Sequence, residues 1–283
     1  MPDLPDYELF RTSGADTAPE PAGPARTAIW IALAVVILAA GVAIYVLYGR
    51  KPAATQTAAK PTEATEQAIR PLGGDADRLN LPPLAETDPI VRELVRKITS
   101  HPTVLAWLTT DGLVRNFTVV VANVVEGVTP ARHLGKLKPP GSFRVVERNR
   151  QTVIDPRSYA RYDGIAAAAA SIDPAGAARL YSTLKPRIEE AYAELGVQPA
   201  SFDRALERAI VVLLETPVID GPIRVEPKGI GYGYADARLE NLTGAQKHLL
   251  RTGPDNVRMI QSALRQWALA LGIPPERLPP AHG

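Results

Sequence analysis

The chain has 283 residues, a net charge of +2 and no cysteine. The absence of cysteine excludes disulfides, thiolate nucleophiles and cysteine-ligated zinc. A charge balance this close to neutral provides no global field for nucleic acid, so nucleic-acid binding is not expected. Residues 1–27 are acidic and rich in proline, alanine and threonine, which predicts a disordered tail.

An apolar run without a charged residue extends from Ala28 to Tyr48. A helix of this length spans roughly 30 Å, the thickness of the hydrocarbon core of a bilayer. Trp30 lies near one end and Tyr45 near the other, where aromatic rings favour the headgroup zone. The preceding tail has no basic region and no cleavage pattern follows, so residues 28–48 are predicted to be an uncleaved transmembrane anchor.

Two opposing signals bear on the orientation of this anchor. The flanking basic residues slightly favour a cytoplasmic C-terminus; they are Arg11 and Arg26 before the run, and Arg50, Lys51 and Lys60 after it. Long C-terminal domains, however, translocate largely regardless of flanking charge. Residues 49–83 also form a Pro/Ala/Thr-rich linker of the kind that crosses an envelope space. We therefore predict that the domain after the anchor faces the periplasm.

Residues 84–272 are predicted to form a helical globular domain that begins with three helices. Asp88-Pro89 has the form of an N-cap followed by proline at the first helical position. A short apolar helix follows, and Thr110 or Asp111 caps the next one, which ends at Gly127. Apolar residues recur at helical spacing along the first and third of these helices: Val91, Leu94, Val95 and Ile98, then Leu113, Phe117, Val120, Val121 and Val124.

The middle of the domain is predicted to contain one small β-hairpin. Residues 128–142 are rich in proline and glycine and are predicted to be a loop. The β-rich runs 143–147 and 151–155 then flank a short polar connection. Asp155-Pro156 begins a helix that continues into the run Ala166–Ala170, where small side chains allow another backbone to approach closely.

The last part of the domain is predicted to be helical again. Asp173-Pro174 starts a helix that Pro186 kinks or splits, and Ser201 caps the helix after it. Residues 216–242 are interpreted as irregular or extended.

Two more helices complete the domain. Thr243 and Gln246 have capping-box spacing at the start of a short helix, and Gly253-Pro254 separates that helix from the last one. Residues 273–283 are predicted to be a frayed, Pro-rich tail. The predicted fold class is therefore mainly α (α+β): a single N-terminal transmembrane helix, then a multi-helix globular domain with one small β-hairpin.

The sequence offers no catalytic, cofactor or metal site. Its histidines are isolated, which argues against zinc or di-iron; they are His101, His133, His248 and His282. Ser182 and Lys185 have Ser-x-x-Lys spacing without the partner motifs of penicillin-binding proteins, and 229–233 lacks the spacing of a phosphate loop. The i, i+4 pair Glu190 and Glu194 is indistinguishable from a solvated helix face.

The strongest local signal is a basic stretch between Ala131 and Arg161, opposed only by Glu147 and Asp155. Its cations are Arg132, Lys136, Lys138, Arg144, Arg148, Arg150, Arg157 and Arg161. We interpret it as a face for an anionic partner, such as lipid headgroups, an acidic glycan or an acidic protein patch. The alternative is an ordinary solvated surface with counterions elsewhere.

Three stretches carry a resemblance to a known family. They are Leu-Lys-Pro-Pro-Gly-Ser-Phe-Arg-Val at 137–145, Asp-Pro-Arg-Ser-Tyr-Ala-Arg-Tyr-Asp at 155–163, and 234–240 together with 246–256. In order and spacing the chain resembles, over about residues 81–271, the bacterial membrane-anchored family catalogued as domain of unknown function 3014. The resemblance implies a Gram-negative envelope setting with an N-terminal anchor, and no activity, ligand or catalytic residue.

Three functions fit this sequence. The leading one is a single-pass protein of the bacterial inner membrane whose periplasmic domain is a non-enzymatic binding or scaffolding module for an envelope protein or an anionic ligand. The second is a hydrolase or transferase of an envelope polymer, which needs a pocket with convergent titratable groups. The third is a structural tether, for which Ala39 and Ala43 provide small-xxx-small spacing within the anchor.

Overall fold

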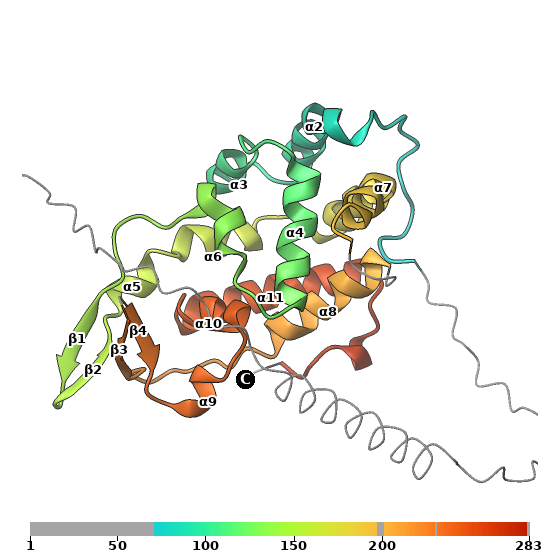
Figure 1. The fold of residues 1–283 in the computed structure, drawn as a ribbon. Helices are drawn as coiled ribbons and strands as arrows, with labels where there is room; N and C mark the ends of the chain where they lie inside the picture. The colour runs from blue at the N-terminus through green and yellow to red at the C-terminus, as the bar shows by residue number, and fades with distance from the viewer. Residues whose placement is uncertain (1–70, 197–200, 230, 282–283) are drawn as a thin grey trace, which may run out of the picture. The chain divides into compact units, whose positions relative to one another are not determined.

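The computed structural model describes residues 71–196, 201–229 and 231–281 (Figure 1). The predicted tail 1–27, the predicted anchor 28–48 and the first part of the predicted linker lie outside the described residues. Among those described, no helix is both long enough and apolar enough to cross a bilayer.

The described part of the chain is mainly helical, as the sequence predicted. Its α-helices are α2 (Asp88–Ile98), α3 (Pro102–Trp107), α4 (Leu113–Val125), α5 (Arg157–Ala160), α6 (Asp163–Ala170), α7 (Pro174–Ala193), α8 (Phe202–Leu214), α9 (Ala237–Glu240), α10 (Gly244–Leu250) and α11 (Pro254–Ala270). The 3-10 helices are η1 (Leu84–Glu86), η2 (Pro130–Leu137) and η3 (Pro275–Arg277), and the strands are β1 (Val145–Arg148), β2 (Gln151–Ile154), β3 (Val225–Lys228) and β4 (Gly231–Tyr234).

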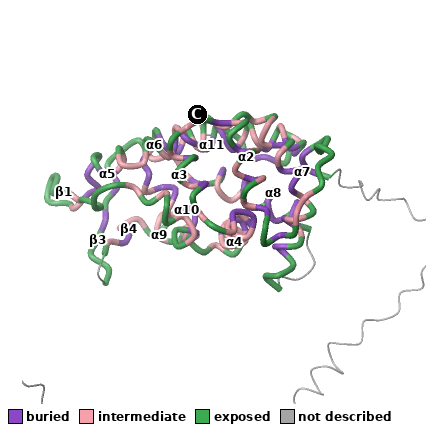
Figure 2. The backbone as a smooth tube through the Cα atoms, turned by 90° about the horizontal axis from the view of Figure 1, so that it is seen from above, coloured by how far each residue is buried: buried purple, intermediate pink, exposed green. Residues whose placement is uncertain are grey.

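The main core lies between α4, α7, α8 and α11, and it is organised around Phe202, which has no exposed surface. The rings of Phe117, Tyr181 and Tyr192 pack against it with centroid distances of 5.5, 6.3 and 5.2 Å. Figure 2 shows the buried residues gathered between the helices, while the β1 end of the molecule is exposed. Tertiary packing of apolar faces is what holds helices of this length together.

The described residues contain two antiparallel hairpins where the sequence predicted one. The predicted hairpin is β1–β2, in which Asn149 and Arg150 both have positive φ, as a two-residue turn between such strands requires. The second, β3–β4, lies within 216–242, which was predicted to be irregular or extended. The extended backbone was expected there, but the pairing was missed and the prediction of a single hairpin was wrong, because β3 and β4 carry proline and glycine, residues with low strand propensity.

Both ends of the described chain pack onto the helices. Leu72 is 5 % exposed, and the amide of Gly73 donates to the Leu271 carbonyl over 2.9 Å. The folded unit therefore begins before residue 84, within the predicted linker. At the other end Ile273 and Leu278 are buried, so the Pro-rich segment to residue 281 covers apolar surface.

Asp88 joins α2 to α4 instead of capping its own helix. Thr87 is the N-cap of α2, but its hydroxyl donates to the Leu84 carbonyl over 2.9 Å and does not cap the helix. The Asp88 carboxylate accepts from the amides of Gly112 and Leu113, each over 2.8 Å, at the start of α4. It thus satisfies two free N–H groups and lies at the positive end of that helix. The expectation that Thr110 or Asp111 would cap α4 was wrong, because a carboxylate distant in sequence takes that place.

We expect Asp88→Ala to lower the free energy of unfolding by about 2 kcal/mol, since it removes two charge-assisted hydrogen bonds at a helix N-terminus. Urea unfolding followed by tryptophan fluorescence measures this loss. Asp111→Ala is the matched control: Asp111 is fully exposed and, among the described residues, pairs only with Arg92, at 3.5 Å, so a change within about 0.5 kcal/mol is expected. Similar losses for the two variants would contradict this assignment of the cap.

Candidate functional site

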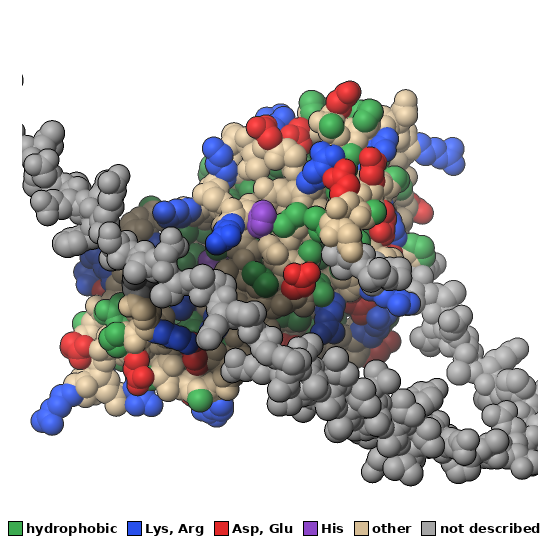
Figure 3. Space-filling view, viewed as in Figure 1, with side chains coloured by type: hydrophobic (Ala, Val, Ile, Leu, Met, Phe, Trp, Pro, Cys, Tyr) green, Lys and Arg blue, Asp and Glu red, His purple; other side chains and the backbone are tan. Residues whose placement is uncertain are grey.

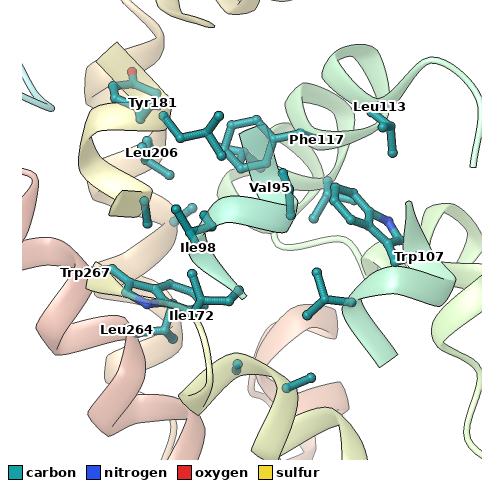
Figure 4. A pocket seen from close by; sticks show the side chains of 18 of the residues that line it. Val95, Ile98, Trp107, Leu113, Phe117, Ile172, Tyr181, Leu206, Leu264 and Trp267 are labelled. Atoms are coloured by element: carbon teal, nitrogen blue, oxygen red, sulfur yellow. The ribbon is translucent and has the colours of Figure 1, made fainter. Parts of the chain in front are cut away.

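The helices line a partly open apolar cavity of about 480 Å³. Side chains from α2, α3, α4, η2, α6, α7, α8 and α11 line it. Figure 4 shows Val95, Ile98, Phe117 and Trp267 among the side chains that surround this space, and Trp107 lies at one side of it. The volume falls within the range of pockets that hold small organic ligands, which is roughly 300–1,000 Å³.

The cavity follows from the distribution of large and small side chains along the helices. On α4, Leu113, Phe117 and Val124 all line it, in agreement with the helical face predicted from the sequence. On α6, by contrast, Ala168 and Ala169 face the cavity with single methyl groups. The alanine run also allows α6 to lie against α11. Volume that larger residues would occupy is therefore left between the walls.

The walls of the cavity offer almost no polar chemistry. Apart from Thr103, the side chains that line it are aliphatic or aromatic. The Tyr181 hydroxyl donates to the Asp203 carboxylate over 2.5 Å, and burial together with this neighbouring charge raises the pKa of Tyr181. Such walls favour a hydrocarbon chain and disfavour a charged or strongly hydrogen-bonding group.

One wall of the cavity, η2, is apolar inside and basic outside. Leu134 and Leu137 are half-buried and line the cavity, while Arg132, Lys136 and Lys138 are exposed. Arg132 and Lys136 lie on η2, and Lys138 follows it in extended backbone, so the exposed cations alternate along the chain with the two leucines that line the cavity. The backbone is non-helical at Leu134, where η2 kinks.

The structure divides the predicted basic stretch into groups with different surroundings. Arg157 forms a 2.6 Å ion pair with Asp155, which holds the pKa of that carboxyl below its usual range. Arg161 donates to the carbonyls of Pro140 and Gly141 over 2.7 and 3.1 Å, and so fixes the loop after η2. These two cations are therefore engaged within the fold.

The other cations of the stretch lie on two elements. Arg144, Arg148 and Arg150 belong to the β1–β2 hairpin or its entry, and Figure 3 shows Lys and Arg side chains at the tip of that hairpin. The other group, Arg132, Lys136 and Lys138, lies on or directly after η2. None of the six cations in these two groups forms an ion pair with another described residue.

A second, more polar cavity of about 470 Å³ lies between the β1–β2 hairpin, α5 and the start of α11. Its carboxylates have partners already. Asp220 and Asp255 both pair with Arg258, at 2.5 and 3.4 Å. Asp163 accepts from the Asn256 side-chain amide over 2.9 Å. Asp220 and Asp255 therefore meet at one guanidinium, and the three carboxylates at this cavity are engaged in an ion pair or a hydrogen bond, whereas acid–base catalysis needs a carboxylate that is free to exchange a proton with its substrate.

Two of the stretches that carry the family resemblance meet at this second cavity. Asn256 donates to the backbone carbonyl of Tyr159 over 3.1 Å, which joins 246–256 to 155–163. Within the described residues, no group of three or more His, Asp or Glu side chains is arranged to hold a metal ion.

Sequence reasoning counts Trp107 and Trp267 among the apolar residues of their helices but missed the cavity that they line. Both are half-buried and line the cavity from α3 and α11. Helical periodicity places such residues on an inward face, but it does not show whether that face meets another helix or a cavity.

The comparisons with curated proteins and with solved structures gave no match. The family model described as "Protein of unknown function (DUF3014)" matches residues 113–267, which is more than half of the chain. The matched region runs from the first residue of α4 into α11, and it includes η2, both hairpins and much of the wall of the apolar cavity. The chain therefore belongs to the DUF3014 family of proteins of unknown function.

Proposed function

We propose that this protein is a non-enzymatic binding module that takes an apolar chain into its central cavity. It is held at the bacterial inner membrane by the segment 28–48, and its folded domain lies in the periplasm. The anchor and its orientation are proposed from the sequence alone. The observation that supports the binding function is the cavity of about 480 Å³ with aliphatic and aromatic walls.

An acyl chain is the ligand that such walls favour. Each methylene group transferred from water to an apolar site contributes about 0.8 kcal/mol. Thr103 is the sole hydroxyl-bearing aliphatic side chain among the lining residues, so a sugar or peptide would leave its polar groups without partners there. A domain tethered to a bilayer is also close to a reservoir of acyl chains, which makes membrane lipid the nearest source of such a ligand.

The alternative function, a hydrolase or transferase of an envelope polymer, receives less support from this geometry. The larger apolar cavity has no acid, base or histidine among its lining residues. The acids at the second cavity are held by Arg258 and Asn256. Binding without chemistry is therefore the function we favour.

Tryptophan quenching tests the binding site directly. The protein has three tryptophans, of which Trp107 and Trp267 line the cavity and Trp30 belongs to the predicted anchor. In full-length Trp30→Phe protein in phosphatidylcholine nanodiscs, we expect dibromostearate methyl ester to quench the two remaining tryptophans. Adding Ala169→Phe, which fills the cavity from α6, is expected to weaken this binding at least tenfold.

Ala170→Phe is the matched control, because Ala170 follows on the same helix but is exposed and does not line the cavity. We expect the tryptophans of the Ala170→Phe variant to be quenched by the ester to the same extent as those of the parent protein. Absence of quenching in the parent, or an equal loss of binding in the Ala169 and Ala170 variants, would exclude the cavity as the site.

A further inference from the structure

The geometry points to an anionic amphiphile as the ligand, with its chain in the cavity and its acidic head on the outer face of η2. We infer that Arg132, Lys136 and Lys138 hold this head. The inference rests on the proposed function and adds the chemical class of the ligand to it.

The first argument is the position of the charges relative to the cavity. Leu134 and Leu137 line the cavity from within, and the three cations lie on the same short element or directly after it. An amphiphile whose chain contacts these leucines therefore has exposed cations within two residues of its binding surface.

The second argument is that the cavity walls themselves cannot hold a head group. They carry no charged side chain, and a buried charge without a partner is very costly. The head must therefore remain at the rim. On η2 it meets cations that have no ion-pair partner among the described residues, and an acidic head would supply the missing countercharge.

The third argument concerns how a ligand enters. The η2 wall is a 3-10 helix with a kink at Leu134, and glycines with positive φ, Gly127 and Gly141, lie on either side of it. Before η2, the Gly244 amide donates to the Gly127 carbonyl over 2.7 Å. After η2, the Arg161 side chain donates to the Pro140 carbonyl. Between those hydrogen bonds η2 contacts α3 and α4. It can therefore lift without breaking an α-helical hydrogen-bond ladder, and this opening would bring the head directly to the cations.

The test compares two probes that share a chain and differ in the head: dibromostearate and its methyl ester. Both are titrated into the full-length Trp30→Phe protein in phosphatidylcholine nanodiscs, at a pH where the acid is ionised and with correction for partition into the bilayer. We expect the acid to bind at least tenfold more tightly than the ester. The triple variant Arg132→Gln, Lys136→Gln, Lys138→Gln is expected to lose this preference and keep the affinity for the ester.

The matched control removes the same charge from the hairpin: Arg144→Gln, Arg148→Gln, Arg150→Gln. We expect it to keep the preference for the acid. Equal affinities of the parent for acid and ester would overturn the inference, and so would an equal loss in the hairpin variant, which would indicate net charge and not a site. Failure of the parent to bind the ester, in contrast, would count against the proposed function itself.

Competition identifies the acidic head. Unlabelled stearate and lysophosphatidate are expected to displace dibromostearate better than lysophosphatidylcholine does. Stronger displacement by stearate would identify a carboxylate head, and stronger displacement by lysophosphatidate a phosphate head. Equal displacement by the zwitterionic lipid would overturn the inference.

Discussion

Gly253→Ala is expected to destabilise the folded domain by about 4 kcal/mol. Gly253 has φ 89° and ψ 161°, a conformation that costs roughly 1–3 kcal/mol for a residue with a Cβ. A Cβ added at Gly253 would also lie 2.6 Å from Cβ and 2.8 Å from Cδ1 of Tyr159. This overpacking adds a further destabilisation of about 1–3 kcal/mol. Urea unfolding followed by tryptophan fluorescence gives the total.

Gly272→Ala separates the two causes. Gly272 has nearly the same φ, 87°, but a Cβ placed there meets no atom within 4 Å. This variant is therefore expected to lose only the backbone contribution, about 1–2 kcal/mol. Equal losses for the two glycines would show that Tyr159 moves aside without cost, contrary to its close packing against Gly253.

Asp203→Ala is expected to lower the free energy of unfolding by about 3–5 kcal/mol. Asp203 is 6 % exposed and accepts from the Tyr181 hydroxyl and the Lys185 ammonium, each over 2.5 Å, and from the Leu72 amide over 3.3 Å. The variant leaves a poorly solvated cation and two donors without their acceptor. Urea unfolding measures the loss, and faster proteolysis near Leu72 is expected because one of the contacts that dock that segment disappears.

The Arg115–Glu194 ion pair provides the control. Its shortest distance is 2.6 Å, but both side chains are more than 40 % exposed. Glu194→Ala is therefore expected to cost less than about 1 kcal/mol, since solvent screens the pair. A loss as large as that of Asp203→Ala would refute burial as the cause of the difference between the two sites.

The longer helices were predictable because each depends on a local repeat. The short elements η2 and α9, and the division of the predicted helix after Asp155 into α5 and α6, were missed, because a segment of one or two turns is too short to show a repeat. The faces that contain Val91 and Val95 on α2, and Leu113 and Phe117 on α4, were read correctly from spacing alone. The capping box of Thr243 and Gln246 also formed as expected, because its partners are three residues apart.

Features set by distant residues were not predictable. Ser201 precedes α8 as expected but makes no side-chain cap hydrogen bond. The Glu189 carboxylate instead accepts from the Phe202 amide over 3.1 Å, as Asp88 does at α4. The β3–β4 hairpin likewise depends on a neighbour: the Ile154 amide donates to the Ile223 carbonyl over 3.0 Å and joins it to the first hairpin.

The candidate site was predictable only in part. The basic stretch was visible as composition, but its contiguity in sequence hid the fact that Arg157 and Arg161 are engaged within the fold. The apolar cavity is a volume between helices, and no local pattern reports a volume. The small residues Ala168 and Ala169 had been interpreted as a packing surface, whereas they also line the cavity.

The docking of residues 72 and 73 determines how a mechanical load would pass through the protein. A pull from the N-terminal side reaches the domain first through the hydrogen bonds of Leu72 to Asp203 and Gly73 to Leu271. Tension thus enters α8, the end of α11 and, through the contacts of Asp75 and Asp77, α7, whereas η2 makes none of these contacts. The wall that we propose to open is therefore not part of the N-terminal docking, and we expect a pull on the proposed tether to leave ligand entry unchanged.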